Sequence, residues 1–209
     1  MMRIESLKTT ADRAGRYWLT TDSGEKLALY RQTLEDFGLY VGLELSDEQW
    51  QQLVSAAGAT SAKMRAVRIV AASAVSKKDL QQRLVQKGEN PDQAAQAVTW
   101  MEELHLVDDG ETARQIVSRC AARGYGLQRA KQALFEKKIP KKYWEKSLAD
   151  YPDQSESISA FLRSHLDGEP DRKAVKRAVD ALLRRGHTYS EIRTVMDHMS
   201  LDAEGFPEE

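Results

Sequence analysis

Two adjacent aspartates, Asp108 and Asp109, form the acidic pair with the most distinctive setting in this sequence. Paired carboxylates can hold Mg²⁺ or act in acid–base catalysis. The same residues can also begin a helix, because Asp108 and Glu111 form an Asp-x-x-Glu start signal and negative charge favours the positive end of the helix dipole. We therefore predict a helix start at this pair and no catalytic role.

The other reactive side chains do not form a recognisable site. Each histidine lacks a cysteine or carboxylate at metal-site spacing, so we expect surface or cap positions for all of them. The four are His105, His165, His187 and His198. The single cysteine, Cys120, lies in an apolar helical series and is expected to be buried. Gly124-Tyr125-Gly126 is too short to indicate a nucleotide-binding loop and is interpreted as a helix break. The sequence thus predicts no enzyme, no metal and no cofactor.

Basic side chains point instead to a partner. The chain has a net charge of -1, yet residues 110–150 carry 10 basic and 4 acidic side chains, and a second basic cluster runs from Arg172 to Arg193. Tyr125, Tyr143 and Trp144 lie among them, and basic with aromatic residues can follow a phosphate backbone. A charged helix face can equally be only solvated, and Trp144 is expected in the core. The candidate contact residues are Arg119, Arg123, Arg129, Lys131, Lys137, Lys138, Lys141, Lys142, Arg172, Lys173, Lys176, Arg177, Arg184 and Arg185.

The composition, 41% hydrophobic and 30% charged, is that of a folded protein. No apolar run approaches the roughly 20 residues that cross a bilayer, and Met1–Glu5 lacks the apolar core of a secretion signal. A single cysteine fits a reducing compartment. We therefore expect a cytoplasmic protein.

An internal repeat determines which elements position these residues. Residues 84–88, 134–138 and 182–186 align without a gap, and their leading leucines are 50 and 48 residues apart. In this range one repeat is one supersecondary unit that stacks on its neighbours. An apolar residue follows each leading leucine after fourteen positions: Val98, Leu148 and Met196.

Each repeat is predicted to contain three helices. The first repeat has a helix at 64–74, a helix capped by Ser76 that carries Leu80 and Leu84 and ends at Gly88, and a helix opened by Asn90-Pro91. The second has helices at 109–123 and 127–137 and a last one opened by Pro140. The third has helices at 157–166 and 172–185 and a last one that begins with a capping box at Thr188.

The first 58 residues differ from the rest. Residues 17–21 and 25–29 favour strands around the turn Asp22-Ser23-Gly24, and residues 3–8 could add a third strand. Ser46 and Gln49 form a capping-box signal for a short helix that we expect to end at Gly58.

These patterns predict a mainly α protein of tandem three-helix repeats, three units with about nine helices, preceded by a small β-rich element. The expected domains are 1–58 for the β-hairpin or three-stranded element with its short helix, 59–107, 108–150 and 151–202 for the three repeats, and 203–209 for a flexible tail.

One turn differs among the repeats. Gly88 and Gly186 stand where a chain that leaves a helix commonly needs positive φ, whereas the second repeat has Lys138. Left-handed backbone costs a lysine roughly 1 kcal/mol or more. We therefore expect the second helix of that repeat to end without a left-handed residue.

The ordered motifs of residues 60–200 resemble the bacterial regulatory protein RecX family. The resemblance is carried by Val75-Ser76-Lys77-Lys78-Asp79-Leu80, Leu84 with Lys87-Gly88, Leu106-Val107-Asp108-Asp109 with Ala113, Arg123-Gly124-Tyr125-Gly126, and Leu134-Phe135-Glu136-Lys137-Lys138-Ile139-Pro140. The chain departs from the family pattern at Ser73, Asp79, Thr112 and Lys138.

The resemblance implies a regulatory protein, not an enzyme, that binds the RecA recombinase and RecA–DNA filaments. It would mainly inhibit recombinase, ATPase and co-protease activity in DNA repair and the SOS response. DNA could also be bound directly; no membrane and no small-molecule substrate are expected. Two alternatives stay open: a helical DNA-binding module that acts independently of RecA, and a plain protein–protein adaptor.

Overall fold

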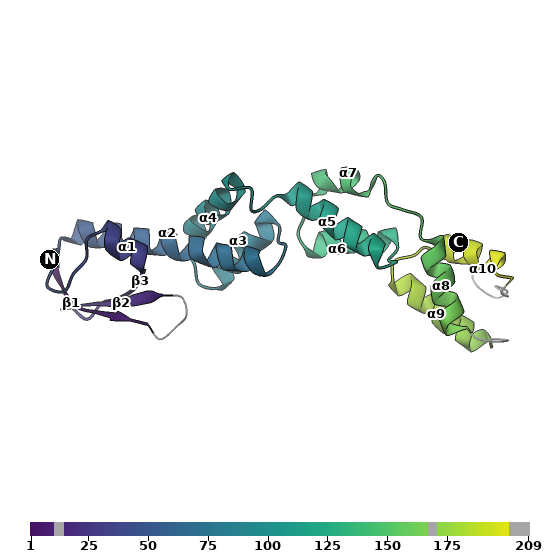
Figure 1. The fold of residues 1–209 in the computed structure, drawn as a ribbon, viewed down its shortest axis with the longest axis horizontal. Helices are drawn as coiled ribbons and strands as arrows, with labels where there is room; N and C mark the ends of the chain where they lie inside the picture. The colour runs from purple at the N-terminus through teal and green to yellow at the C-terminus, as the bar shows by residue number, and fades with distance from the viewer. Residues whose placement is uncertain (11–14, 167–170, 201–209) are drawn as a thin grey trace. The chain divides into compact units, whose positions relative to one another are not determined.

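The computed structural model describes residues 1–10, 15–166 and 171–200, and this part of the chain is mainly helical, with ten α-helices and one small antiparallel sheet (Figure 1). The predicted fold class is confirmed. Contacts within the chain divide it into two compact units, Met1–Val107 and Asp108–Glu209. The expected tail at 203–209 lies outside the described residues, and the division into three repeats stays a prediction.

The sheet opens the first unit and has the strand order β3-β2-β1-β4. Its strands are β1 (Met2–Thr9), β2 (Arg16–Thr21), β3 (Lys26–Tyr30) and β4 (Glu44–Leu45). Leu19 at its centre pairs with Leu7 of β1 and Leu27 of β3. The hairpin turn contains Gly24, whose φ is +84°. The three predicted strands are confirmed, whereas β4 and the short helix α1 (Arg31–Asp36) were not predicted.

Helix α2 (Asp47–Ala72) corrects the predicted break at Gly58. The capping box of Ser46 and Gln49 begins the helix as expected, but the helix continues through the glycine and includes the separately predicted segment from residue 64. A Cβ at Gly58 would collide with the side chain of Gln93, whose Nε2 donates to the Ser55 carbonyl at 3.1 Å. The glycine therefore serves close packing between helices, not termination.

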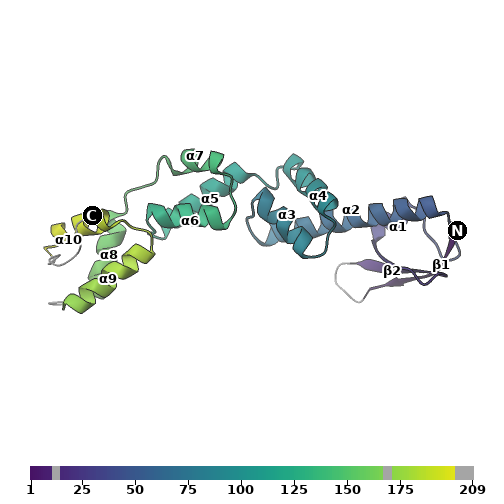
Figure 2. The same cartoon turned by 180° about the vertical axis from the view of Figure 1, so that it is seen from behind.

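Helix α2 joins two cores of the first unit. Its first turns place Trp50 and Leu53 against the sheet residues Ile4, Leu19 and Leu29. Its last turns bury Ala62 and Ala66 against α3 (Lys77–Gln86) and α4 (Pro91–Glu103), which Figure 2 shows beside α2. Alanines suit this position because small side chains let helices approach closely.

The caps of α3 and α4 are those the sequence predicts. The Ser76 hydroxyl accepts from the Asp79 amide at 3.1 Å, and Asn90 accepts from the Asp92 amide at 2.9 Å. Leu80 and Leu84 are fully buried in the core of this repeat, with Met101 opposite them.

The second unit begins with α5 (Asp109–Ala122) and α6 (Leu127–Glu136), which lie side by side (Figures 1 and 2). Pro140 does not open an α-helix directly. A 3₁₀ turn, η1 (Lys141–Tyr143), comes first, and α7 (Trp144–Leu148) is only five residues long. Trp144 packs against this core as expected, and its Nε1 donates to the Ile139 carbonyl at 2.9 Å.

Three further helices complete the second unit: α8 (Ser155–His165), α9 (Arg172–Arg184) and α10 (Tyr189–His198). Their apolar faces form one core around Leu162, Leu182 and Ile192. The predicted capping box is present, because Thr188 accepts from the Glu191 amide and the Glu191 side chain accepts from the Thr188 amide.

The turn that follows the second helix is left-handed in all three repeats, which corrects the expectation for Lys138. The φ angles are +90° at Gly88, +56° at Lys138 and +87° at Gly186. In each copy this residue donates to the carbonyl three positions before it: Gly88 to Val85 at 2.9 Å, Lys138 to Phe135 at 2.8 Å and Gly186 to Leu183 at 2.9 Å. The hydrogen bonds of the turn outweigh the steric preference of the lysine.

Candidate partner-binding surface

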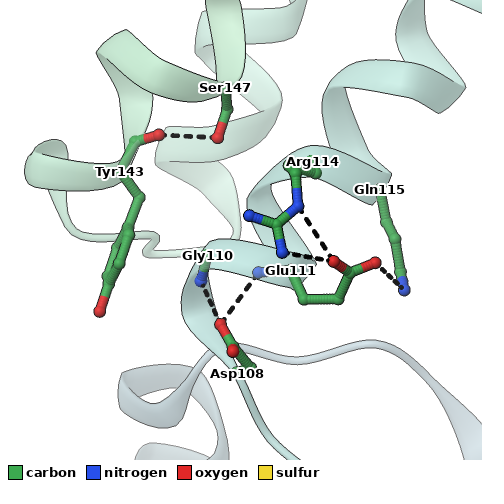
Figure 3. Close-up of polar contacts among 7 residues, drawn as sticks. All are labelled: Asp108, Gly110, Glu111, Arg114, Gln115, Tyr143 and Ser147. Atoms are coloured by element: carbon green, nitrogen blue, oxygen red, sulfur yellow. Dashed lines mark hydrogen bonds and ion pairs between the residues drawn. The ribbon is translucent and has the colours of Figure 1, made fainter.

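The aspartate pair acts as a helix cap (Figure 3). Oδ1 of Asp108 accepts from the backbone amides of Gly110 at 2.7 Å and Glu111 at 2.9 Å. Glu111 is in turn held by Arg114 at 2.6 Å, and Asp109 is buried. Across the described residues no group of three or more His, Cys, Asp or Glu side chains could hold a metal ion. The capping interpretation is confirmed.

Gly124-Tyr125-Gly126 connects the second repeat to the third through backbone contacts. The Gly126 amide donates to the Arg185 carbonyl at 3.0 Å, and the Gln128 amide donates to the Gly186 carbonyl at 3.2 Å. A Cβ on Gly126 would collide with the Gly186 carbonyl. The motif is a helix break, as predicted, and it also lets two turns meet.

His187 belongs to the same junction, which corrects its predicted surface or cap position. Its side chain is buried, and Nε2 lies 3.0 Å from the Gly124 carbonyl. A carbonyl only accepts, so Nε2 carries the hydrogen, while Nδ1 is buried with no hydrogen-bond partner in the described part of the chain. Burial lowers the pKa of His187, and the bond to Gly124 opposes this in part. The imidazole is therefore held neutral.

Two further buried groups surround this junction. Tyr151 donates its hydroxyl to the Tyr125 carbonyl at 2.6 Å, and burial raises the pKa of Tyr151 to about 12. The Cys120 thiol is buried, and desolvation raises its pKa although Arg129, Arg123 and Arg119 act in the opposite direction. Cys120 is the packing residue that the sequence predicts.

Four of the predicted contact residues gather near this junction. Arg119 and Arg123 are exposed on one face of α5, four residues apart. Arg123 and Arg185 line the same open groove of about 470 Å³. Arg129 is half-buried, forms a 3.0 Å ion pair with Glu136, and packs its backbone against Gly186. The structure thus brings arginines of two repeats to one place.

An aromatic ring forms part of that groove. The Arg185 guanidinium lies 4.4 Å from the ring centroid of Phe161, and the His165 ring stacks on Phe161 at 3.9 Å. Such cation–π and stacking contacts fix the direction of a cation without neutralising it. Arg185 is therefore an oriented positive charge at the edge of the groove.

The remaining candidates lie elsewhere in the second unit. Four belong to the last turn of α6 or to η1, or stand just beside them, and of these Lys137 and Lys138 are half-buried while Lys141 and Lys142 are exposed. Lys131 is half-buried on α6. Four exposed cations occupy the first turns of α9, about 18 Å along the helix from Arg184 at 1.5 Å per residue. These are Arg172, Lys173, Lys176 and Arg177. The predicted set therefore forms more than one cluster.

Sequence reasoning missed a basic groove in the first unit. A groove of about 310 Å³ is lined by cations of α2 and α3 and of the turn that follows α3: Arg65, Arg68, Arg83 and Lys87. Residues 60–109 carry 7 basic and 7 acidic side chains, and this balance concealed the cluster. The available signal was helical spacing, because Arg83 and Lys87 are four residues apart and Arg65 and Arg68 are three apart.

Within the described residues, no helix is both long and apolar enough to span a membrane.

Curated relatives of the chain are named regulatory protein RecX. The protein from Streptococcus gordonii is 22% identical over 190 residues, which cover 89% of this chain and 74% of the relative. The protein from Cronobacter sakazakii is 31% identical over 96 residues, which cover 41% of this chain and 58% of that relative. No protein-family model matches the chain.

Solved structures of RecX have the same fold. A crystal structure of regulatory protein RecX matches with a TM-score of 0.63 and 18% identity, and covers 94% of this chain and 100% of its own. The crystal structure of RecX from Lactobacillus salivarius matches with a TM-score of 0.59 and 19% identity, and covers 69% of this chain and 98% of its own.

The fold and the basic surface define a helical-repeat protein built for contact with a partner. The comparisons support the regulatory protein RecX family for this chain, and the resemblance predicted from the sequence is confirmed.

Proposed function

We propose that this protein binds the RecA recombinase and its DNA filament and restrains filament activity. The observation that carries the proposal is the similarity to proteins named regulatory protein RecX over 89% of the chain. As a RecX-type regulator, it would inhibit strand exchange, ATP hydrolysis and co-protease activity without performing chemistry itself, and it would act in the cytoplasm.

The surface of the second unit supports this proposal physically. Arg119, Arg123 and Arg185 present positive charge near the meeting point of two repeats. Stacked helical repeats offer extended faces for a partner, and cations on such a face attract DNA phosphates or acidic protein surface. The proposed contact set remains the fourteen basic residues predicted from the sequence.

The DNA-dependent ATPase of RecA tests the proposal directly. ATP hydrolysis is measured on single-stranded DNA with this protein at sub-stoichiometric ratios to RecA. We expect inhibition, because one regulator bound in a filament stops the growth of many subunits. An unchanged rate, with a normally folded protein shown by circular dichroism, would favour a plain adaptor.

A DNA-binding module independent of RecA is the second candidate, favoured by the excess of basic residues at 110–150. It would bind bare DNA with strong salt dependence and would lower the ATPase rate only by competing for DNA. Raising the DNA concentration separates the two, because excess DNA would relieve competition but not direct inhibition of the filament.

A further inference from the structure

The groove between α2 and α3 of the first unit holds four cations that the basic surface of the second unit does not include. Three are arginines and one is a lysine, and Ile69, Ala72 and Ser73 complete the lining. The groove measures about 310 Å³.

Two of these cations are already paired with carboxylates at the edge of the groove. Nε of Arg65 lies 2.6 Å from Oε1 of Glu89, which is 8% exposed. Nη2 of Arg83 lies 2.8 Å from Oδ2 of Asp79, which is 6% exposed. These ion pairs fix the direction of both guanidinium groups and leave further N–H groups on each for a ligand.

The other two cations have no carboxylate partner in the described part of the chain. Nη2 of Arg68 donates to the neutral hydroxyl of Tyr30 at 2.6 Å, and Lys87 is exposed four residues beyond Arg83. Four cations against two carboxylates leave the groove with an excess of two positive charges. This excess is carried by an arginine that is already oriented and by a mobile lysine.

The second repeat has cations at the matching positions. With an offset of 50 residues, Arg123 corresponds to Ser73 and Lys137 corresponds to Lys87. In both repeats, then, the last turn of the first helix or the face beside it and the end of the second helix carry positive charge. A feature that recurs in two copies of a repeat is explained less well by random surface charge.

We propose that the groove lined by Arg65, Arg68, Arg83 and Lys87 binds a backbone phosphate of nucleic acid. Arginine forks match the oxygens of a phosphate, and donors that approach from two helices suit its tetrahedral shape better than a flat carboxylate. The groove is shallow and open, so it admits one group of a polymer that continues on both sides. The proposal deepens the proposed function by adding a DNA contact in the first unit.

The test uses the full-length chain and a fluorescein-labelled single-stranded oligonucleotide, without recombinase, and measures anisotropy between 50 and 200 mM salt. The variant Arg68→Ala with Lys87→Ala removes the two unpaired cations and leaves both ion pairs in place. The matched control, Lys26→Ala with Lys78→Ala, removes two exposed cations of the same unit that do not line the groove. Circular dichroism verifies that both variants are folded.

We expect the groove variant to bind at least tenfold more weakly at low salt and the slope of log affinity against log salt to fall by about two, one for each lost phosphate contact. The control should retain the affinity of the unaltered protein. Tyr30→Phe, which removes only the hydroxyl that holds Arg68, should weaken binding by a smaller factor.

Three results would overturn the proposal: equal affinity of the groove variant and the control, no binding of bare DNA by the unaltered protein at 50 mM salt, or equally strong competition by polyglutamate, which would assign the groove to an acidic protein. Competition by inorganic phosphate alone, without oligonucleotide binding, would overturn the nucleic-acid source. RecA inhibition by the unaltered protein is measured separately, so a failure of the groove is distinguishable from a failure of the proposed function.

Discussion

Single residues carry both the strain and the titratable groups of this fold. Lys138 keeps a left-handed backbone that glycine adopts at the same place in the other two repeats, with φ of +56° against +90° and +87°. His187 is buried at a junction where its Nδ1 finds no described partner. Both features were missed by sequence reasoning, because neither depends on the residue type alone.

Replacing the strained lysine should stabilise the protein. Lys138→Gly is expected to raise the free energy of unfolding by about 1 kcal/mol, the cost of left-handed backbone for a side chain with a Cβ. Urea denaturation followed by circular dichroism measures the change. The reciprocal control, Gly88→Lys, should lower stability by a similar amount, since no atom lies within 4 Å of a Cβ there. A lower stability of Lys138→Gly would show that the lysine side chain makes a stronger contact than the strain it imposes.

His187 predicts a loss of stability in acid. Its pKa in the folded protein lies below the ordinary value of 6.5, so the unfolded chain binds the proton more tightly and acidification favours unfolding. Its contribution is complete above about pH 6.5 and decreases as the pH falls below that value. Urea denaturation from pH 8 to pH 5 follows this change. His187→Gln, which retains a donor for the Gly124 carbonyl, should show a shallower pH dependence; an identical pH profile would contradict the assignment.

At the scale of elements, glycines decide where helices approach and where turns meet. Gly58 does not interrupt α2 and instead makes room for Gln93 of α4. Gly126 and Gly186 let the turn after α5 touch the turn after α9. The basic groups Arg123 and Arg185 are brought to one groove by this contact, so the junction positions the candidate surface.

Two glycines with the same backbone conformation separate the turn from the junction. Gly88→Ala should cost about 1 kcal/mol through its positive φ alone. Gly186→Ala carries the same penalty and also drives a Cβ into the backbone of Arg129, so we expect it to cost about 1–3 kcal/mol more. Unfolding free energies measure the difference, and hydrogen exchange at the Gly126 amide reports on the junction. Equal costs for the two variants would contradict a tight junction.

At the scale of the whole molecule, a net charge of -1 conceals local excesses of positive charge. The candidate cations form a cluster near Arg123 and Arg185, another at the start of α9, and the groove of the first unit. Attraction of a polyanion therefore depends on which cluster meets it and not on the total charge.

Charge reversal in two clusters of the second unit shows which one contacts the filament. Arg119→Glu with Arg123→Glu and, separately, Arg172→Glu with Lys176→Glu change exposed residues only. We expect the first pair to weaken binding to RecA–DNA filaments at least tenfold, with a shallower salt dependence and unchanged helicity, because its cations converge with those of the next repeat. Filament co-sedimentation at several salt concentrations measures this. Unaltered binding of both pairs at moderate salt would refute the proposed contact set.

The sequence by itself determined the helical-repeat fold, the helix starts at Ser46, Ser76, Asn90, Asp108 and Thr188, and the resemblance to RecX. These features are local: a cap depends on residues three positions apart, and helical periodicity on a few turns. The tertiary structure alone decided that α2 continues through Gly58, that His187 is buried and that four cations of α2 and α3 line one groove. Each of these depends on contacts between residues far apart in the chain, which no local pattern encodes.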